Sequence, residues 1–225
     1  MTRPNVLLQA DKLGKTFRSD GLETPVLFEV DLEVRQGEFV AIMGPSGCGK
    51  STLMHVLGLM LSPTSGRVWL DGEDTSGWGD GERARRRREK IGFVFQRFNL
   101  LPTVSAYQNL ALAQRIRGQR LDGGIGRVLD AVGLADRAGY KPGRLSVGQQ
   151  QRVAVARAIV HRPKLLLADE PTGSLDSANS QRILDLFRDI HRTDGLTIVL
   201  ITHSPQVAQA ADRIVHLADG RIRHV

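Results

Sequence analysis

A glycine-rich stretch in the N-terminal quarter of the chain limits its fold more than any other feature does. It fits the pattern G-x-x-x-x-G-K-[ST] without a mismatch and reads Gly44-Pro45-Ser46-Gly47-Cys48-Gly49-Lys50-Ser51. A short, uniformly apolar run at residues 39–43 precedes it, as expected of a strand buried on both faces, and an apolar helical stretch follows from about Ser51. The order strand, glycine loop, helix predicts a phosphate-binding loop.

The chemistry of this loop suits a nucleotide. Glycines let the backbone wrap closely around phosphates with N–H groups pointing inward, and the following helix presents its positive end to the same anion. We expect Lys50 to reach the β- and γ-phosphates and the hydroxyl of Ser51 to bind Mg²⁺. The alternative is a chance glycine-rich turn, and the correct flanks on both sides argue against it.

Two neighbouring acids at the end of a second apolar run complete the candidate site. The run Leu165-Leu166-Leu167-Ala168 is followed by Asp169 and Glu170. Carboxylates at the carboxyl end of a parallel strand lie beside the mouth of the phosphate-loop strand. Asp169 is then expected to hold Mg²⁺ through water, and Glu170 to polarise the attacking water as a general base. The alternative is a strand whose end simply turns acidic at the surface.

The rest of the chain alternates between strand and helix patterns. In residues 27–34, one face of a half-buried strand is predicted to hold Phe28, Val30, Leu32 and Val34. Further strands are predicted at residues 66–70, 164–168, 196–202 and 213–217. Between about residues 97 and 145 the pattern becomes helical, and Ser105 with Gln108 forms a capping-box pattern. We therefore expect one α/β domain, residues 1–225, with a parallel sheet, a β part and a helical insertion.

Composition excludes several classes of protein. The single cysteine cannot form an internal disulfide, and the longest apolar runs are far shorter than the roughly 18–20 residues that span a bilayer. We expect neither a membrane channel nor a secreted protein. The net charge of +7 attracts polyanions without choosing among them. The run Arg85–Arg88 predicts a solvated helix face, or a contact with acidic lipid or a partner. It has no interleaved aromatics, which argues against a dedicated nucleic-acid groove.

Taken together, these residues resemble the ATP-binding cassette (ABC) ATPases, and five further elements match that family in order. They are Phe17, at the place of an adenine-stacking aromatic; Gln96, similar to the Q-loop glutamine; Leu145-Ser146-Val147-Gly148-Gln149, similar to the LSGGQ signature; Ser174-Leu175-Asp176, similar to the D-loop; and His203, which looks like the switch histidine. The match covers essentially the whole chain, and the signature separates this family from most other phosphate-loop NTPases.

The resemblance implies a fold, an activity and a set of site residues. The fold is α/β, a P-loop NTPase (RecA-like) core with an N-terminal antiparallel β subdomain and an inserted helical subdomain at about residues 97–145. The activity is ATP hydrolysis, with ATP and Mg²⁺ as cofactors. The residues expected to bind ATP are Phe17, Gly44, Pro45, Ser46, Gly47, Cys48, Gly49, Lys50, Ser51, Thr52, Ser146, Gly148, Gln149 and Asp176; the catalytic residues are Glu170, His203, Gln96 and Lys50; and the Mg²⁺ ligands are Ser51, Gln96 and Asp169.

Several of these residues have an ordinary alternative. Phe17, in a β region, could be a core aromatic, and Gln96 could be an amide that caps its strand. His203 could be a surface residue after a strand, and Cys48 a small filler residue. Ser146 with Gln149 forms a capping box that opens a helix, and this holds whatever else Ser146 does.

The family also implies that two copies assemble head to tail. The helix opened by Ser146 would then contact the γ-phosphate bound by the other subunit, so that two sites form only in the dimer. Val147 departs from the pattern, because the family usually has glycine at this place. A β-branched side chain here is expected to hold the partner's phosphate farther away.

Four segments narrow the resemblance to the lipoprotein-release and macrolide-export ATPases: Pro63-Thr64-Ser65-Gly66, Phe93-Val94-Phe95-Gln96, Asn99-Leu100-Leu101-Pro102 and Ala168-Asp169-Glu170-Pro171-Thr172-Gly173. Such ATPases work with a membrane permease, which we expect to be a separate polypeptide. The chain would then lie on the cytoplasmic face of the inner membrane and drive export or extraction of a lipoprotein, peptide or drug-like cargo. A non-transport regulator, as in cell division, and a nucleic-acid ATPase of related fold are the alternatives, and the cargo is open.

Overall fold

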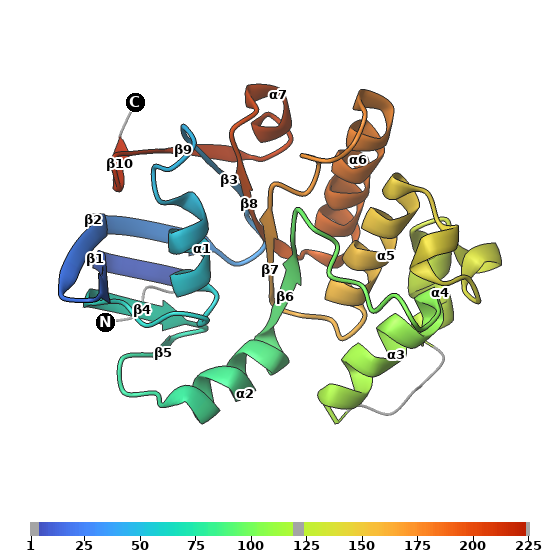
Figure 1. Ribbon diagram of the computed structural model, residues 1–225, viewed down its shortest axis with the longest axis horizontal. Helices are drawn as coiled ribbons and strands as arrows, with labels where there is room; N and C mark the ends of the chain where they lie inside the picture. The colour runs from blue at the N-terminus through green and yellow to red at the C-terminus, as the bar shows by residue number, and fades with distance from the viewer. Residues whose placement is uncertain (1–4, 119–123, 224–225) are drawn as a thin grey trace.

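Two β-sheets with helices between and around them make up the protein (Figure 1). The computed structural model describes residues 5–118 and 124–223. The strands of the larger sheet are β3 (Phe39–Met43), β6 (Ile91–Val94), β7 (Leu165–Asp169), β8 (Thr197–Thr202), β9 (Arg213–Ala218) and β10 (Arg221–Arg223). Their order is β10-β9-β3-β8-β7-β6, and all neighbours run parallel except β10 beside β9.

The smaller sheet is antiparallel and comes from the N-terminal part of the chain. Its strands are β1 (Val6–Ser19), β2 (Leu22–Arg35), β4 (Ser65–Leu70) and β5 (Glu73–Asp74), in the order β2-β1-β4-β5. In β2, Val30, Leu32 and Val34 are buried as predicted, but Leu27 is buried in place of Phe28. Glu29 has a φ of 46°, and the register with β1 shifts beside it, so this bulge moves Phe28 off the buried face.

Helices separate the two sheets and cover the larger one. Helix α1 (Lys50–Leu57) lies between the sheets, whereas α5 (Val147–Ile159) and α6 (Ser177–Asp194) cover the opposite face of the larger sheet (Figure 1). The remaining helices are α2 (Asp80–Lys90), α3 (Ala106–Ile116), α4 (Gly124–Ala131), α7 (Pro205–Ala208) and the 3₁₀ turns η1 (Ala135–Arg137) and η2 (Pro142–Arg144). Within residues 5–118 and 124–223, none of these helices is both long and apolar enough to cross a membrane.

The central strands of the larger sheet are apolar throughout because both of their faces are covered. In β7, Leu165 and Leu167 pack in the core shared with α1 and the smaller sheet. Leu166 and Ala168 pack in a second core, shared with α5 and α6. Successive side chains of a strand point to opposite faces, so a strand buried on both sides needs an unbroken apolar run. The uniformly apolar runs of the sequence are thereby explained.

A third apolar core lies among α3, α4 and α5. The hydroxyl of Ser105 accepts a hydrogen bond from the N–H of Gln108, whose side chain accepts from the N–H of Ser105, so the predicted capping box opens α3. Helices α3 and α4 fall within residues 97–145, the segment that the sequence predicts as a helical subdomain. The predicted α/β architecture is confirmed: a largely parallel core sheet, an N-terminal antiparallel sheet and a helical insertion.

Candidate nucleotide-binding site

The glycine-rich segment Gly44–Ser51 links the end of β3 to α1. Gly47 and Gly49 have φ values of 78° and 101°, which residues with a Cβ rarely adopt. Gly44 has no room for a side chain, because a Cβ there would lie 2.0 Å from the carbonyl oxygen of Leu217 in β9. The glycines are therefore required by the backbone path and by the close approach of β9.

Lys50 is the first residue of α1 and carries a buried cation into the loop. It is 8% exposed, and its Nζ donates hydrogen bonds to the carbonyl oxygens of Gly44 and Pro45, both at 2.8 Å. Gly49, at the N-cap position, has no side chain that could cap the helix. A helix whose first N–H groups are uncapped, together with an ammonium group at the same place, forms a site for a phosphate.

The strands bring the two predicted acids to the same edge of the sheet as the loop. Asp169 ends β7 and lies opposite Ile201 of β8, which in turn lies opposite Ile42 of β3, one residue before that strand ends. Because β7, β8 and β3 run parallel, their carboxyl ends meet at one edge. Asp169 and the start of the phosphate loop therefore face the same space.

The carboxylate of Asp169 is held in an electrostatically costly position. Burial raises the pKa of Asp169, a hydrogen bond with Ser51 opposes this, and the charge of Glu170 raises it further. Electrostatic interactions with His55 and Lys50 lower the pKa of Asp169, but the net result is a raised pKa. Among the residues that the structure describes, Oδ1 of Asp169 is buried and has no hydrogen-bond partner.

These residues fit a Mg²⁺ ion. The carboxylate of Asp169 and the hydroxyl of Ser51 are hard oxygen ligands that lie together, and Mg²⁺ is commonly bound by one or two such groups with phosphates and water. A buried carboxylate oxygen without a partner is costly unless a cation or a water meets it. The third predicted ligand, Gln96, is exposed, and a Cβ built on Gly173 would lie 3.0 Å from its Nε2. Gly173 donates its N–H to the carbonyl oxygen of Glu170, so Gln96 lies at the turn that follows the two acids.

Glu170 is held by three donors from the end of β8. Its Oε1 accepts the backbone N–H of His203 at 2.9 Å and lies 2.7 Å from Nδ1 of the same residue. Its Oε2 accepts the hydroxyl of Thr202 at 3.2 Å. The lone pairs of Oε1 are thus engaged, whereas Oε2 keeps acceptor capacity. The side chain of His203 is 67% exposed, so its ring can move and release Oε1.

The other predicted nucleotide-binding residues differ in how exposed they are. Thr52 is half-buried in α1, directly after Ser51. Phe17 on β1 is 40% exposed, with Nζ of Lys15 5.2 Å from its ring centroid, so the alternative of a core aromatic is wrong. Asp176 caps α6, where its carboxylate accepts the N–H of Asn179 at 2.7 Å.

The signature segment lies away from the phosphate loop of its own chain. Ser146 and Gln149 form the predicted capping box and open α5, on the face of the larger sheet opposite α1 (Figure 1). Gly148 packs against Asn179, because a Cβ there would lie 2.5 Å from Oδ1 of that residue. Val147 is 47% exposed. The fold therefore gathers Lys50, Ser51, Gln96, Asp169, Glu170 and His203, but not Ser146, Gly148 or Gln149.

Three residues at or near the site were not predicted from the sequence. Thr202 donates to Glu170, and its position before His203 at a strand end was the available signal. The side chain of Asn179 donates to Oδ2 of Asp176 at 2.7 Å and touches Gly148; the spacing Asp-x-x-Asn at a helix start would have found it. Arg157 of α5 donates to the carbonyl oxygens of Phe98, at 2.9 Å, and Asn99, a contact between distant segments that no local pattern signals.

Comparison with known proteins agrees with this geometry. Residues 27–173 match the family model described as "ABC transporter". The lipoprotein-releasing system ATP-binding protein LolD of Bordetella pertussis is 43% identical over 99% of both chains. The macrolide export ATP-binding/permease protein MacB of Syntrophobacter fumaroxidans is 46% identical over 96% of this chain, which spans only 31% of that protein.

A solved structure gives the same fold. It is the dimeric, post-hydrolysis state of the ATP-binding cassette MJ0796 bound to ADP and Pi, which superimposes with a TM-score of 0.89 at 38% identity and covers 97% of each chain. The P-loop NTPase fold inferred from the resemblance is thereby confirmed. On the combined strength of the sequence match, the fold and the site, this chain belongs to the ABC transporter family and is an ATP-binding ATPase of that family.

Proposed function

We propose that this chain is the ATP-hydrolysing subunit of an export or extraction transporter, which dimerises around two ATP molecules and drives a separately encoded membrane permease. One observation carries the proposal: Lys50, Ser51, Asp169, Glu170 and His203 meet at the carboxyl edge of the larger sheet. A phosphate-binding cation, a metal-binding carboxylate and a general base in one place are what hydrolysis of a nucleotide requires.

The position of the signature segment supports a homodimer. Ser146, Gly148 and Gln149 lie at the start of α5, on the far face of the larger sheet from α1, so a second copy is needed to bring a signature to each phosphate loop. The similar cassette MJ0796 is a dimer in its ADP- and Pi-bound structure. Asp176, at the N-terminus of α6, lies next to the signature through Asn179 and belongs to the same proposed interface.

Within each site the residues have distinct tasks. The loop N–H groups and Lys50 bind the phosphates, and Ser51 and Asp169 hold Mg²⁺, which when bound neutralises charge on the phosphates. Glu170 accepts the proton of the attacking water at a carboxylate oxygen. Oε2, which keeps acceptor capacity, is the oxygen open to that proton, while the exposed ring of His203 is free to leave Oε1 and approach the γ-phosphate. Gln96, at the turn after Glu170, is placed to report the occupied state.

The names of the relatives support the transport part of the proposal. LolD is the ATP-binding protein of a lipoprotein-releasing system, and this chain matches it over its length. MacB combines an ATP-binding part with a permease, and this chain matches 31% of its length. We therefore place the chain on the cytoplasmic face of the inner membrane, where the permease would hold it, with a lipoprotein, peptide or drug-like molecule as cargo.

The test of the catalytic part is Glu170→Gln. The amide keeps the size of the side chain but cannot take up the proton, so ATP binding should persist while hydrolysis falls by about 10²–10⁴-fold. ATP should then hold the variant as a dimer, measured by light scattering. Lys50→Ala should lose nucleotide binding instead, and Glu89→Gln, on α2, should match the unmodified protein. Near-normal turnover by Glu170→Gln would refute the assignment.

A further inference from the structure

The positive charge of the chain is concentrated in one part of the fold. Residues 97–162, from the residue after Gln96 to the turn after α5, contain eleven Lys and Arg but only three Asp and Glu, whereas the whole chain has a net charge of +7. The remaining residues are therefore close to neutral as a group. A charge surplus of this kind, confined to one region, attracts an anionic partner to that region.

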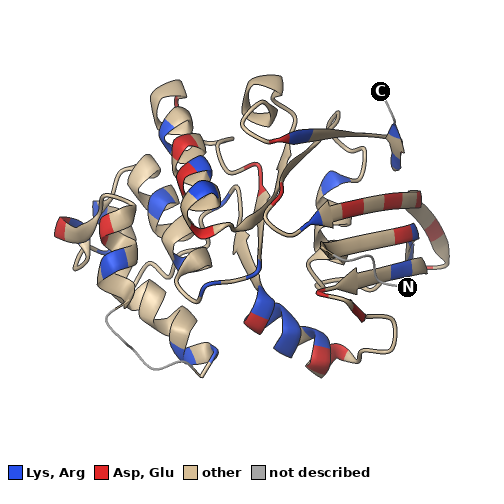
Figure 2. Ribbon diagram, turned by 180° about the vertical axis from the view of Figure 1, so that it is seen from behind, with Lys and Arg blue, Asp and Glu red and all other residues tan. Residues whose placement is uncertain are grey.

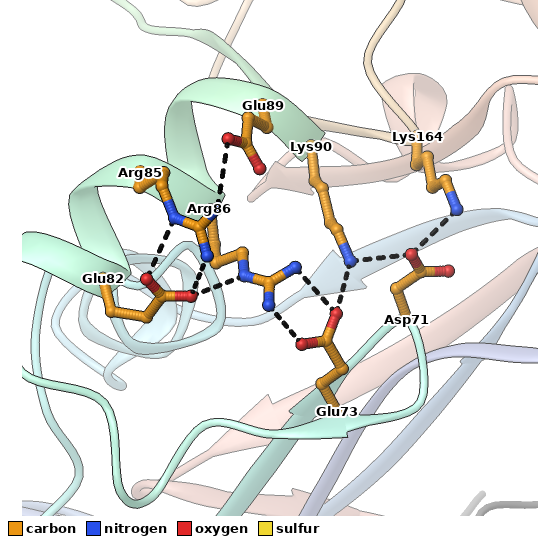
Figure 3. Close-up of polar contacts among 8 residues, drawn as sticks. All are labelled: Asp71, Glu73, Glu82, Arg85, Arg86, Glu89, Lys90 and Lys164. Carbon is orange, nitrogen blue, oxygen red and sulfur yellow. Dashed lines mark hydrogen bonds and ion pairs between the residues drawn. The ribbon is translucent and has the colours of Figure 1, made fainter.

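The conspicuous run Arg85–Arg88 lies outside this region, and much of its charge is paired. Figure 3 shows Glu82 between Arg85 and Arg86, with Glu73 bridging Arg86 and Lys90. Asp71 continues the network to Lys90 and Lys164. The hydrogen bonds from the two arginines lower the pKa of Glu82 to about 2, so this pairing persists at physiological pH. The network pairs most of the charged side chains on this face of α2, and Arg88 is not part of it.

Arg88 belongs to a second group of arginines at the end of α2. Nε of Arg117 donates to the carbonyl oxygen of Arg88, which joins the ends of α3 and α2. The N–H of Lys164 donates to the carbonyl oxygen of Lys90 at 3.0 Å, which brings the turn after α5, with Arg162, to the same end. We call Arg88, Arg115, Arg117 and Arg162 the basic edge. None of the four pairs with a carboxylate within residues 5–118 and 124–223.

Arg88 and Arg117 lie on neighbouring elements that their hydrogen bond joins, and Figure 2 shows Lys and Arg along α2 and at the end of α3. Burial lowers the pKa of Arg117 to about 10, and the charges of Arg88 and Arg157 add to the effect. A cation whose pKa is lowered by neighbouring cations marks a place where an anion would be stabilised.

Apolar side chains accompany the basic edge. On the outer face of α3, Leu112 is 40% and Ile116 is 57% exposed, and they lie one turn apart, with Arg115 and Arg117 on either side of Ile116. A soluble acidic segment would gain little from exposed aliphatic groups between cations. Exposed aliphatic and basic side chains on one surface are typical of a contact with the headgroup region of an anionic bilayer.

We propose that the basic edge binds the anionic phospholipid headgroups of the membrane that carries the permease, with Leu112 and Ile116 entering the headgroup region. The proposal rests on the proposed function only in that the permease supplies the membrane. The arginines bind the headgroup phosphates, and the aliphatic side chains contribute a smaller, salt-independent part of the binding free energy. Lipid contact is thereby assigned to the ends of α2, α3 and α5, not to the paired arginines of α2.

Vesicle binding of the purified chain tests this without permease and without ATP. The chain should co-sediment with vesicles of phosphatidylcholine and phosphatidylglycerol, less with phosphatidylcholine alone, and less as ionic strength rises. The triple variant Arg88→Gln, Arg115→Gln, Arg162→Gln should bind roughly 10²-fold more weakly, since each cation near an anionic surface contributes about fivefold. Arg117 stays unchanged because it also joins α3 to α2.

The matched control removes the same charge elsewhere. Arg18→Gln, Arg67→Gln and Arg221→Gln together change three exposed arginines that pair with carboxylates on the smaller sheet and β10. This variant should bind anionic vesicles within about threefold of the unmodified chain. Leu112→Ser with Ile116→Ser should weaken binding at every salt concentration. Circular dichroism and ATP hydrolysis check that each variant is folded.

Three results would overturn the proposal. Equal binding to neutral and anionic vesicles would show that headgroup charge is not recognised, and an equal loss in the control variant would show that net charge alone matters. The unmodified chain could also fail to bind anionic vesicles while the triple variant loses its association with the permease. That result would assign the basic edge to an acidic protein segment instead. Loss of hydrolysis in Glu170→Gln is measured separately, so failure of the proposed function and failure of the lipid contact are distinguishable.

Discussion

Gly148 offers the sharpest test of how the signature segment is supported. A Cβ at this position would lie 2.5 Å from Oδ1 and 2.7 Å from Cγ of Asn179. Asn179 cannot keep its place beside such a group, and its Nδ2 currently donates to Asp176 at 2.7 Å. The substitution Gly148→Ala should therefore displace the side chain of Asn179 and remove this hydrogen bond. The backbone N–H of Asn179 can still donate to the carboxylate of Asp176, so the cap of α6 is kept.

The magnitude follows from two opposing effects. Forcing a methyl group into a filled contact costs about 1–3 kcal/mol, while replacing glycine by alanine in a helix gains up to about 1 kcal/mol. The free energy of unfolding should then fall by about 0–2 kcal/mol. In an Asn179→Ala background the amide atoms that cause most of the obstruction are gone; the Cβ of residue 179 stays 3.2 Å from the new methyl group and needs to shift by only a few tenths of an ångström, so most of the helix gain is left. There Gly148→Ala should raise the free energy of unfolding by about 0.5–1 kcal/mol, a reversal of sign.

Urea unfolding of four proteins measures this cycle: the unmodified chain, each single variant and the double variant, followed by circular dichroism. A coupling of about 1–3 kcal/mol between the two positions is expected. If Gly148→Ala has the same effect in both backgrounds, the glycine is not kept by its contact with Asn179, and the reasoning fails.

Two further predictions concern exposed and buried positions of the motifs. Cys48 is 7% exposed, so alkylation of the folded chain should be slow, and slower still with MgATP. Loss of ATP hydrolysis should be proportional to the fraction of Cys48 that is labelled. Cys48→Ser should stay active under the same treatment, and inhibition of this variant would show that the reagent reacts elsewhere. Val147→Gly, tested by light scattering in the Glu170→Gln background, should strengthen ATP-driven dimerisation by up to about tenfold, or about 1.4 kcal/mol. Unchanged or weaker dimerisation would mean that the valine is accommodated.

Local patterns of the sequence were sufficient for much of the fold. The two capping boxes, Ser105 with Gln108 and Ser146 with Gln149, involve groups three residues apart, so the residues alone specify them. Unbroken apolar runs identify the buried strands, and the fixed spacing of its residues identifies the glycine-rich loop. These features need no knowledge of what lies across the core.

The errors and omissions have a common cause in contacts between distant segments. Strict alternation puts Phe28 on the buried face of β2, but the bulge at Glu29 that moves it away depends on the pairing with β1. The bonds of Arg157 to residues near the Q-loop and the contact of Asn179 with Gly148 likewise join segments that only the tertiary structure brings together. No periodicity or spacing within either segment contains that information.

The hydrogen bonds of Arg157 tie α5, near its C-terminal end, to the segment after Gln96, so a tilt of the helix about this point would move its other end. Arg157 holds the backbone of Phe98 near one end of the helix, and Val147 begins the other end, about 15 Å away at 1.5 Å per residue. A rotation of about 5° around the Arg157 end would carry the Ser146 hydroxyl through about 1.3 Å, close to half a hydrogen-bond length. A displacement of the segment after Gln96 would therefore reach the proposed signature through Arg157, and a tilt of this size is comparable with the difference between a made and a broken hydrogen bond.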